Sequence, residues 1–290
     1  MKKKRAVRWL ALPLLLAIAR AGTAQQRFAG FDRNDYPGDA AMPALRRDFR
    51  YTGYWLNAPP GETSNSWTGK RTLLQRYGFG FLVLFNGRMD AQLQGKDAAA
   101  LGAMDGRAAV ARALREGFAR DVLIFLDIEE GGRLLPEQAA YIFSWIDTVR
   151  MAGARAGVYC SGIEVHDESG VISTAEDIAD REMTRKRRSS ANKSVQGIDV
   201  KLALWIAEDA CPPSPGCSHT IPSIDTLPVN ERKITTIWQY ALSPRRAEFS
   251  AHCPENVAPD GNCYAPGLPR EANSFVDLDT ANSPDPSEDH

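Results

Sequence analysis

The sequence predicts an α/β protein whose fold is a single-domain, TIM-like (β/α)8 barrel. Eight short apolar runs are spread along the chain, helical patterns separate several of them, and acidic residues end three of them. Near-continuous apolar content is typical of parallel strands that are covered on both faces. Eight such strands in about 250 residues favour a closed barrel. A doubly wound open sheet is the structural alternative.

The first 24 residues have the pattern of a secretory signal peptide. A basic start is followed by the apolar stretch 9–19 and by the small residues Gly22, Thr23 and Ala24. Such a segment is removed after export, so we expect a secreted or periplasmic protein. The apolar stretch is too short for a good membrane span, and no other long apolar run occurs. We therefore expect no membrane span and a barrel over residues 25–280.

Charge argues against some classes of partner. The signal segment holds six of the 35 Lys and Arg residues, so 29 remain against 36 Asp and Glu, a net charge of about −7. Such a surface does not favour nucleic acid, and "RKRR" at 185–188 is interpreted as a solvated helix end. No glycine-rich phosphate fingerprint follows a strand, so no nucleotide cofactor is expected. The protein is predicted to be a monomer without cofactors.

The elements follow in a regular order. Proline near the start of one helical pattern, at Pro136, is typical of a first helical turn. The polar stretch 281–290 is predicted to be a frayed tail. The expected strands are 27–32, 51–56, 78–85, 122–127, 155–160, 201–207, 234–240 and 274–279, and the clearest helices are 98–118, 135–154 and 174–186.

Five cysteines in an exported chain suggest disulfides. Cys211 and Cys217 enclose one short loop, and Cys253 and Cys263 enclose another, so these are the natural local pairs. Cys160 ends an apolar strand and is expected to be a buried free thiol. In the barrel both cysteine loops follow strands, and the hypothesis is that they border the cleft.

Four acidic residues fall where a barrel enzyme places its chemistry, at the carboxyl ends of strands. Asp32 ends the first expected strand, Asp127 ends the fourth with Glu129 just beyond it, and Asp277 lies near the end of the eighth. Residues two apart in a strand point to the same side, so Asp127 and Glu129 face the same way, roughly 7 Å apart. Glu130 points away. Closing the barrel brings these acids to one opening.

Clustered carboxylates raise the pKa of one another, so that one acid stays protonated near neutral pH. Glycoside hydrolysis needs this arrangement, with one carboxyl as proton donor and another that assists water or the developing positive charge. The alternatives are helix-capping Asp residues and a Ca²⁺ or Mg²⁺ site. No regular ligand loop and no metal spacing among the histidines is present, so no metal site is predicted.

Aromatic residues in late strand positions favour a carbohydrate ligand, since an aromatic face can hold a sugar ring. Packing in the barrel core is the alternative for each of them. The predicted substrate-binding residues are Tyr54 (or its neighbour Trp55), Tyr159, Trp205, Trp238 and Gln239.

The motifs "GFDRNDYPG", "FLDIEE", "AGVYCSG", "LALWIAED", "IWQYA" and "FVDLD" occur in this order between about residues 27 and 280. Together they resemble the lysozyme-type glycoside hydrolase family 25. They resemble still more closely its relative, the glycoside-hydrolase-like domain of unknown function in secreted bacterial proteins. The resemblance implies the same barrel, a site made by Asp32, Asp127, Glu129 and Asp277, and Glu129 as proton donor. Its implied substrate is peptidoglycan.

The sequence therefore predicts an exported glycosidase that acts on peptidoglycan or another cell-wall polysaccharide. A non-catalytic carbohydrate-binding barrel would keep the same aromatic and polar groups and is the main alternative. A small-molecule or metal-binding protein is the third.

Overall fold

The computed structural model describes residues 26–191, 201–208, 221–241 and 276–288. The signal segment and the four loop cysteines, Cys211, Cys217, Cys253 and Cys263, lie outside these residues. Within the described ranges, no helix combines the length and apolar character that crossing a membrane requires. Cys160 is a free, buried thiol, as expected.

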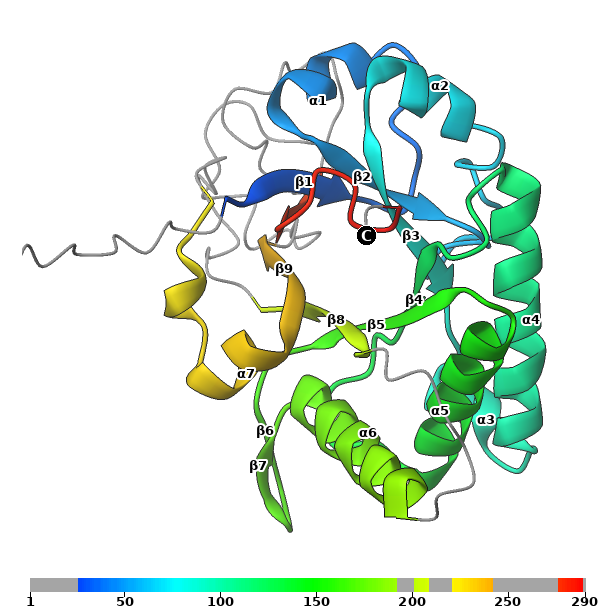
Figure 1. Cartoon of the computed structure of the whole chain (residues 1–290), viewed down its shortest axis with the longest axis vertical. Coiled ribbons are helices and arrows are strands. Elements are labelled where there is room, and N and C mark those ends of the chain that lie inside the picture. Colours follow the sequence, from blue (N-terminus) through cyan, green and yellow to red (C-terminus); the bar gives the residue numbers. More distant parts are fainter. Residues whose placement is uncertain (1–25, 192–200, 209–220, 242–275, 289–290) are drawn as a thin grey trace, which may run out of the picture.

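Eight strands close into a barrel, which confirms the predicted fold class (Figure 1). The order around the barrel is β1-β10-β9-β8-β5-β4-β3-β2. All eight apolar runs form strands, with ends that differ from the expected ones by a few residues. They are β1 Phe28–Asp32, β2 Tyr51–Trp55, β3 Gly80–Asn86, β4 Leu123–Asp127, β5 Arg155–Ser161, β8 Ala203–Ala207, β9 Thr235–Ala241 and β10 Asp277–Ala281.

The last strand departs from the expected parallel arrangement. β10 runs antiparallel to both of its neighbours, β1 and β9, whereas the other neighbouring pairs are parallel. The all-parallel prediction was wrong for this strand because apolar content reports burial and carries no information about direction. The reversal places the first residue of β10 at the same end of the barrel as the last residue of β1.

Helices cover the outside of the barrel, with the long pair α4 (Ala98–Glu116) and α5 (Pro136–Met151) side by side (Figure 1). Gly102 of α4 permits their close approach, because a Cβ there would lie 2.2 Å from the Tyr141 carbonyl oxygen. Helix α6 (Thr174–Ala191) lies beside α5 (Figure 1). The remaining helical segments are α1 Met42–Asp48, α2 Arg71–Tyr77, α3 Asp90–Leu93, the 3-10 turn Ile224–Thr226 and α7 Val229–Ile234.

A small hairpin, β6 (Val165–Asp167) paired with β7 (Gly170–Ile172), is inserted between β5 and α6. Its backbone turns at Gly170, whose φ of 127° disfavours other residues. The sequence analysis did not predict this hairpin.

Large side chains fill the barrel where glycines face them. The Tyr51 ring occupies the space above Gly30, where a Cβ would lie 1.8 Å from the ring, and Phe125 covers Gly157 in the same way at 2.6 Å. Tyr51 and Phe125 are fully buried. The barrel interior is therefore a packed core below the carboxyl ends of its strands.

The expectation of a frayed C-terminal tail was wrong for residues 282–288. The Asp285 carboxyl accepts from the Phe81 N–H at 2.9 Å, and the Ser287 hydroxyl accepts from the Val83 N–H at 2.9 Å. The Ser287 carbonyl accepts from the Leu123 N–H at 2.9 Å. The tail satisfies backbone groups near the amino ends of β3 and β4, and its polar composition gave no sign of that.

Candidate functional site

Two acids meet where β1 ends and β10 begins. Asp32, the last residue of β1, pairs in register with Asp277, the first residue of β10. Asp32 is 7 % exposed and Asp277 is half-buried. The sequence placed Asp277 near the end of a parallel strand, whereas it begins an antiparallel one, and both arrangements bring it to the carboxyl ends of the other strands. The acidic rim is defined here as Asp32, Asp127, Glu129 and Asp277.

Asp127 is a buried acid. It ends β4, is 2 % exposed, and neither of its carboxyl oxygens has a hydrogen-bond partner within the described part of the chain. A buried polar group that lacks partners is costly to the folded protein. A buried polar group of this kind can be a place where a ligand binds.

Glu129 follows on the same side, and its side chain is exposed. Ile128 between them donates its N–H to the Tyr159 carbonyl oxygen at 3.0 Å, which extends the pairing of β4 with β5 to this point. The Glu129 charge acts on both Asp127 and Asp32, so Glu129 lies near these two acids. No hydrogen bond among the described residues fixes the Glu129 carboxyl.

Electrostatic interactions among the acids of the rim, together with burial, raise the pKa values of three of them. Burial, followed by the charges of Glu129 and Asp32, raises the pKa of Asp127 well above its usual range. Burial raises the pKa of Asp32 to about 6, and the Glu129 charge adds to this. Partial desolvation raises the pKa of Glu129. Each of these shifts favours the protonated form of a rim acid, which is the state that general acid catalysis requires.

Hydrogen bonds connect the rim to the barrel wall. The Tyr159 hydroxyl donates to the Gln239 carbonyl oxygen at 2.7 Å, and the Gln239 amide donates to Asp32 at 2.7 Å. The Trp205 ring packs edge-on against Tyr159, with 4.9 Å between ring centroids. The structure thus places Tyr159, Trp205 and Gln239 next to the acids. Because Trp205 and Gln239 are fully buried, contact of these residues with a substrate stays a prediction.

One site residue escaped the sequence analysis. Asp279 of β10 is fully buried and accepts a hydrogen bond from the Trp205 indole at 3.0 Å. Burial and the neighbouring Asp32 raise its pKa well above the usual range. The signal was present in "VDLD", since Asp279 lies two residues from Asp277 and shares its face.

Two of the predicted substrate-binding residues lie elsewhere. The Tyr54 hydroxyl donates to Glu116 of α4, and its ring packs against Trp67, Phe81 and Phe118, so Tyr54 belongs to the packing between barrel and helices. Trp238 pairs with Thr280 and Ile206 on the outer face of its strand and donates to the Glu208 carbonyl oxygen at 2.8 Å. The prediction that Tyr54 and Trp238 bind substrate was therefore wrong. A late position in a strand does not reveal whether a side chain points into the barrel or outward.

The neighbour Trp55 does lie near the rim, where its indole donates to the Arg33 carbonyl oxygen at 3.0 Å. This bond ties the end of β2 to the residue after Asp32.

Glu130 points away from the rim, as predicted. Its carboxylate accepts from the Asp90 N–H at 2.8 Å and from the Gln138 amide at 2.6 Å, which joins the loop after β4 to α3 and α5.

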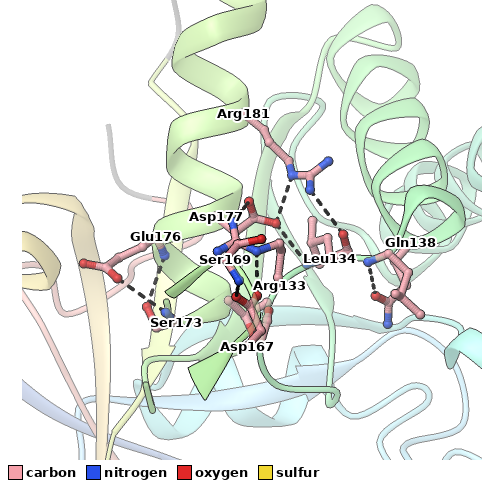
Figure 2. Close-up of polar contacts among 12 residues, drawn as sticks. Arg133, Leu134, Gln138, Asp167, Ser169, Ser173, Glu176, Asp177 and Arg181 are labelled. Carbon is pink, nitrogen blue, oxygen red and sulfur yellow. Dashed lines mark hydrogen bonds and ion pairs between the residues drawn. The ribbon is translucent and has the colours of Figure 1, made fainter. Parts of the chain in front are cut away.

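The loop that carries Glu129 is also held by the start of α6. Figure 2 shows Asp177 between Leu134 and Arg181, accepting from the Leu134 N–H and the Arg181 guanidinium, each at 2.9 Å. Arg133 reaches Asp167 of the hairpin at 2.7 Å in the same view. These bonds hold the loop after β4 at Arg133 and Leu134, whereas no hydrogen bond among the described residues holds the Glu129 carboxyl.

The described residues contain no group of three or more His, Cys, Asp or Glu side chains that is arranged to hold a metal ion.

The closed barrel, with interacting acids at the carboxyl ends of its strands, defines a glycoside-hydrolase-like protein. The chain belongs to the Rv2525c-like, glycoside hydrolase-like domain family, whose model matches residues 56–207, a little over half of the chain. A search of curated proteins found no match.

Solved structures resemble this chain at low sequence identity. An uncharacterized protein of B. stearothermophilus is 19 % identical with a TM-score of 0.55, over 87 % of this chain and 94 % of that one. The Tat-secreted protein Rv2525c of Mycobacterium tuberculosis, in complex with L-tartrate, is 12 % identical with a TM-score of 0.46, over 88 % and 95 %. A family GH25 lysozyme from Aspergillus fumigatus is 15 % identical with a TM-score of 0.45, over 89 % and 95 %.

Proposed function

We propose that this protein is an exported glycosidase that hydrolyses a cell-wall polysaccharide with N-acetylated sugars, such as peptidoglycan. The observation that carries the proposal is the Asp127 carboxyl, which is buried and unpartnered beside the exposed Glu129. The solved lysozyme and the family description add a polysaccharide context to this geometry.

Asp127 has the chemistry to hold an acetamido group. Both of its oxygens lack donors from the residues that the structure describes. A sugar N-acetyl group offers an N–H donor, and its binding would satisfy a carboxyl that the fold leaves unsatisfied. The same contact would orient the acetamido oxygen toward the anomeric carbon of that sugar.

Glu129 suits the role of general acid. Its pKa is raised by partial desolvation, and its exposed carboxyl can approach a bound glycan. In the proposed reaction Glu129 gives its proton to the glycosidic oxygen as the bond to the anomeric carbon breaks. Water then adds its oxygen to that carbon, either directly or after the acetamido oxygen has attacked, and its proton returns to a carboxylate of the rim. Asp32 and Asp277 would orient this water.

The second candidate is a carbohydrate-binding barrel without catalysis. It is favoured by the Glu129 carboxyl itself, which no hydrogen bond among the described residues holds in place. Catalytic groups work best when they are oriented before the substrate arrives.

Release of reducing ends from peptidoglycan and from chitin-type polymers separates the two candidates. Wild type should release them, and Glu129→Gln should lose at least about a hundredfold in rate while still sedimenting with the insoluble polymer. Glu130→Gln is the matched control and should keep most of the activity, because the Glu130 carboxylate points away from the rim and joins the loop after β4 to α3 and α5. Wild type that binds the polymer but never releases ends would support the binding barrel instead.

A further inference from the structure

Five inward-facing side chains form a ring inside the barrel, one each from β1, β5, β8, β9 and β10. On one side, hydrogen bonds connect Tyr159 to Gln239 and Gln239 to Asp32. On the other side, Asp279 accepts a hydrogen bond from Trp205, whose ring packs edge-on against Tyr159. Asp279 closes it, since its Cα pairs with Gly30 on one side and with Gln239 on the other. Its carboxyl therefore lies between the strand of Asp32 and the strand of Gln239.

The surroundings of Asp279 do not suit a charged carboxylate. The residue is fully buried, its second carboxyl oxygen has no hydrogen-bond partner among the described residues, and the donor to the first is the neutral Trp205 indole. Transfer of an uncompensated charge into such a site is costly enough that the group takes up a proton instead. Two adjacent buried carboxyls also resist being charged together.

Asp32 is the better candidate for the charged member of the pair. It lies at the end of β1, two residues closer to the rim than the Gly30 that faces Asp279, and it accepts from the Gln239 amide at 2.7 Å. A hydrogen bond to the ionised form favours that form.

We infer that Asp279 is a positioning residue, which holds a proton inside the barrel and thereby keeps Asp32 as the carboxylate of the pair. The directions of the pKa shifts agree with this. Burial raises the pKa of both residues, but their mutual interaction raises the pKa of Asp279 and lowers that of Asp32.

The charge on Asp32 in turn sets the direction of the hydrogen bonds from Tyr159 to Gln239 and from Gln239 to Asp32. A carboxylate accepts hydrogen bonds only, so the Gln239 amide must present its NH₂ to Asp32 and its oxygen to the Tyr159 hydroxyl. The Tyr159 proton is then committed to Gln239, and its oxygen lone pairs are left to accept a sugar hydroxyl. This last consequence rests on the proposed function, whereas the protonation of Asp279 does not.

Ionisation is testable without any substrate. The carboxyl carbons of ¹³C-labelled aspartates can be titrated by NMR in the wild-type protein, with assignment by variants. We expect Asp32 to titrate near pH 6 and Asp279 to stay protonated through that transition. An Asp279 that is ionised before Asp32 would overturn the inference.

Asp279→Asn gives the sharper comparison, because asparagine keeps the acceptor for Trp205 and supplies a neutral N–H donor toward Asp32. If Asp279 is protonated, this change should leave the midpoint of Asp32 within about half a pH unit; if Asp279 is charged, removing its charge should lower that midpoint by about one unit or more. Asp277→Asn, on the same face and nearer the rim, is the matched control and should leave Asp279 protonated.

Turnover supplies a second readout. Asp279→Asn should keep most of the wild-type activity, whereas Asp279→Ala, which lacks the donor, should lose at least about tenfold and shift the acidic limb of the pH profile upward. A substantial loss in Asp279→Asn would count against the inference. If wild type has no activity, the proposed function fails and the NMR titration still decides the role of Asp279.

Discussion

Asp32 and Asp277 face each other across the β1–β10 ladder, one at the end of its strand and the other at the start. The antiparallel direction of β10 creates this relationship. In a parallel strand, the last residue of β10 would have been at this end of the barrel. The chain thus adds an acid to the rim from a strand that runs the opposite way to the other seven.

The buried acids should make stability depend on pH. A carboxyl whose folded pKa is raised above its unfolded value stabilises the fold fully below the unfolded pKa, and this contribution is lost as the pH rises through the folded pKa. For Asp32 the pKa shift from 3.8 to about 6 corresponds to at most about 3 kcal/mol of folding stability. This stability declines as the pH rises above about 4 and continues to decline past about 6. Asp127 adds to the loss in the same direction.

Asp127→Asn should therefore raise the free energy of unfolding at pH 8 and flatten its decline between pH 4 and pH 8. Urea unfolding across this range measures both quantities. Asp35→Asn, at an exposed position, is the control and should follow wild type. An Asp127→Asn curve parallel to that of wild type would contradict a shifted pKa at Asp127.

Gly53 makes room for Asp32. A Cβ at this position would lie 2.7 Å from the Asp32 Cβ, and neither atom can move without the backbone. Gly53→Ala should displace Asp32, lower turnover at least about tenfold and cost about 1–3 kcal/mol of stability. Gly131→Ala is the control on the neighbouring loop, because its Cβ would meet Ser161 at an ordinary 3.9 Å. Equal activities of the two variants would refute the packing argument.

Asp177 should matter through the loop that carries Glu129. Asp177→Ala leaves the buried Leu134 N–H without its acceptor, which should cost about 1–3 kcal/mol and speed hydrogen exchange at Leu134. We expect kcat to fall more than binding. Asp167→Ala, which removes a more exposed ion pair with Arg133 of the same loop, should cost less than about 1 kcal/mol. Unchanged exchange at Leu134 in Asp177→Ala would argue against this anchor.

The C-terminal tail should contribute to stability. Ser287→Ala removes the acceptor of the Val83 N–H at a fully buried position, so we expect a loss of about 1–3 kcal/mol in chemical denaturation. Asn282→Ala, at an exposed position, should change stability by about 0.5 kcal/mol or less. If both variants unfold together with wild type, the tail does not stabilise the barrel.

The two tyrosines should separate packing from ligand contact. Tyr54→Phe loses only the hydrogen bond to Glu116, so glycan binding should stay at the wild-type level and stability should fall by about 1 kcal/mol. Tyr159→Phe removes the hydroxyl next to the acids and should weaken glycan binding severalfold. Calorimetry with a soluble oligosaccharide compares them, and weaker binding in Tyr54→Phe would restore Tyr54 to the site.

The acids that end strands could be predicted because polar groups are conspicuous after fully apolar runs. "FLDIEE" predicts Asp127 and Glu129 on one face; in the structure Asp127 is buried, Glu129 is exposed, and the Glu129 charge acts on Asp127. The faces of the aromatic residues could not be predicted in this way. Every barrel strand is covered on both sides, so inward and outward residues are equally apolar, and Tyr54 and Trp205 look alike in the sequence.

The sequence by itself determined eight buried strands and the acids that end three of them, since these follow from local composition, and it favoured the closure of the strands into a barrel. Only the tertiary structure decided the direction of β10, the entry of Asp279 into the barrel and the docking of the tail at Ser287. Each of these depends on contacts between segments far apart in the chain, about 70 to 250 residues in the hydrogen bonds and pairings involved. Burial can be inferred from a local pattern, but the partner of a buried group is set by the closure of the whole barrel.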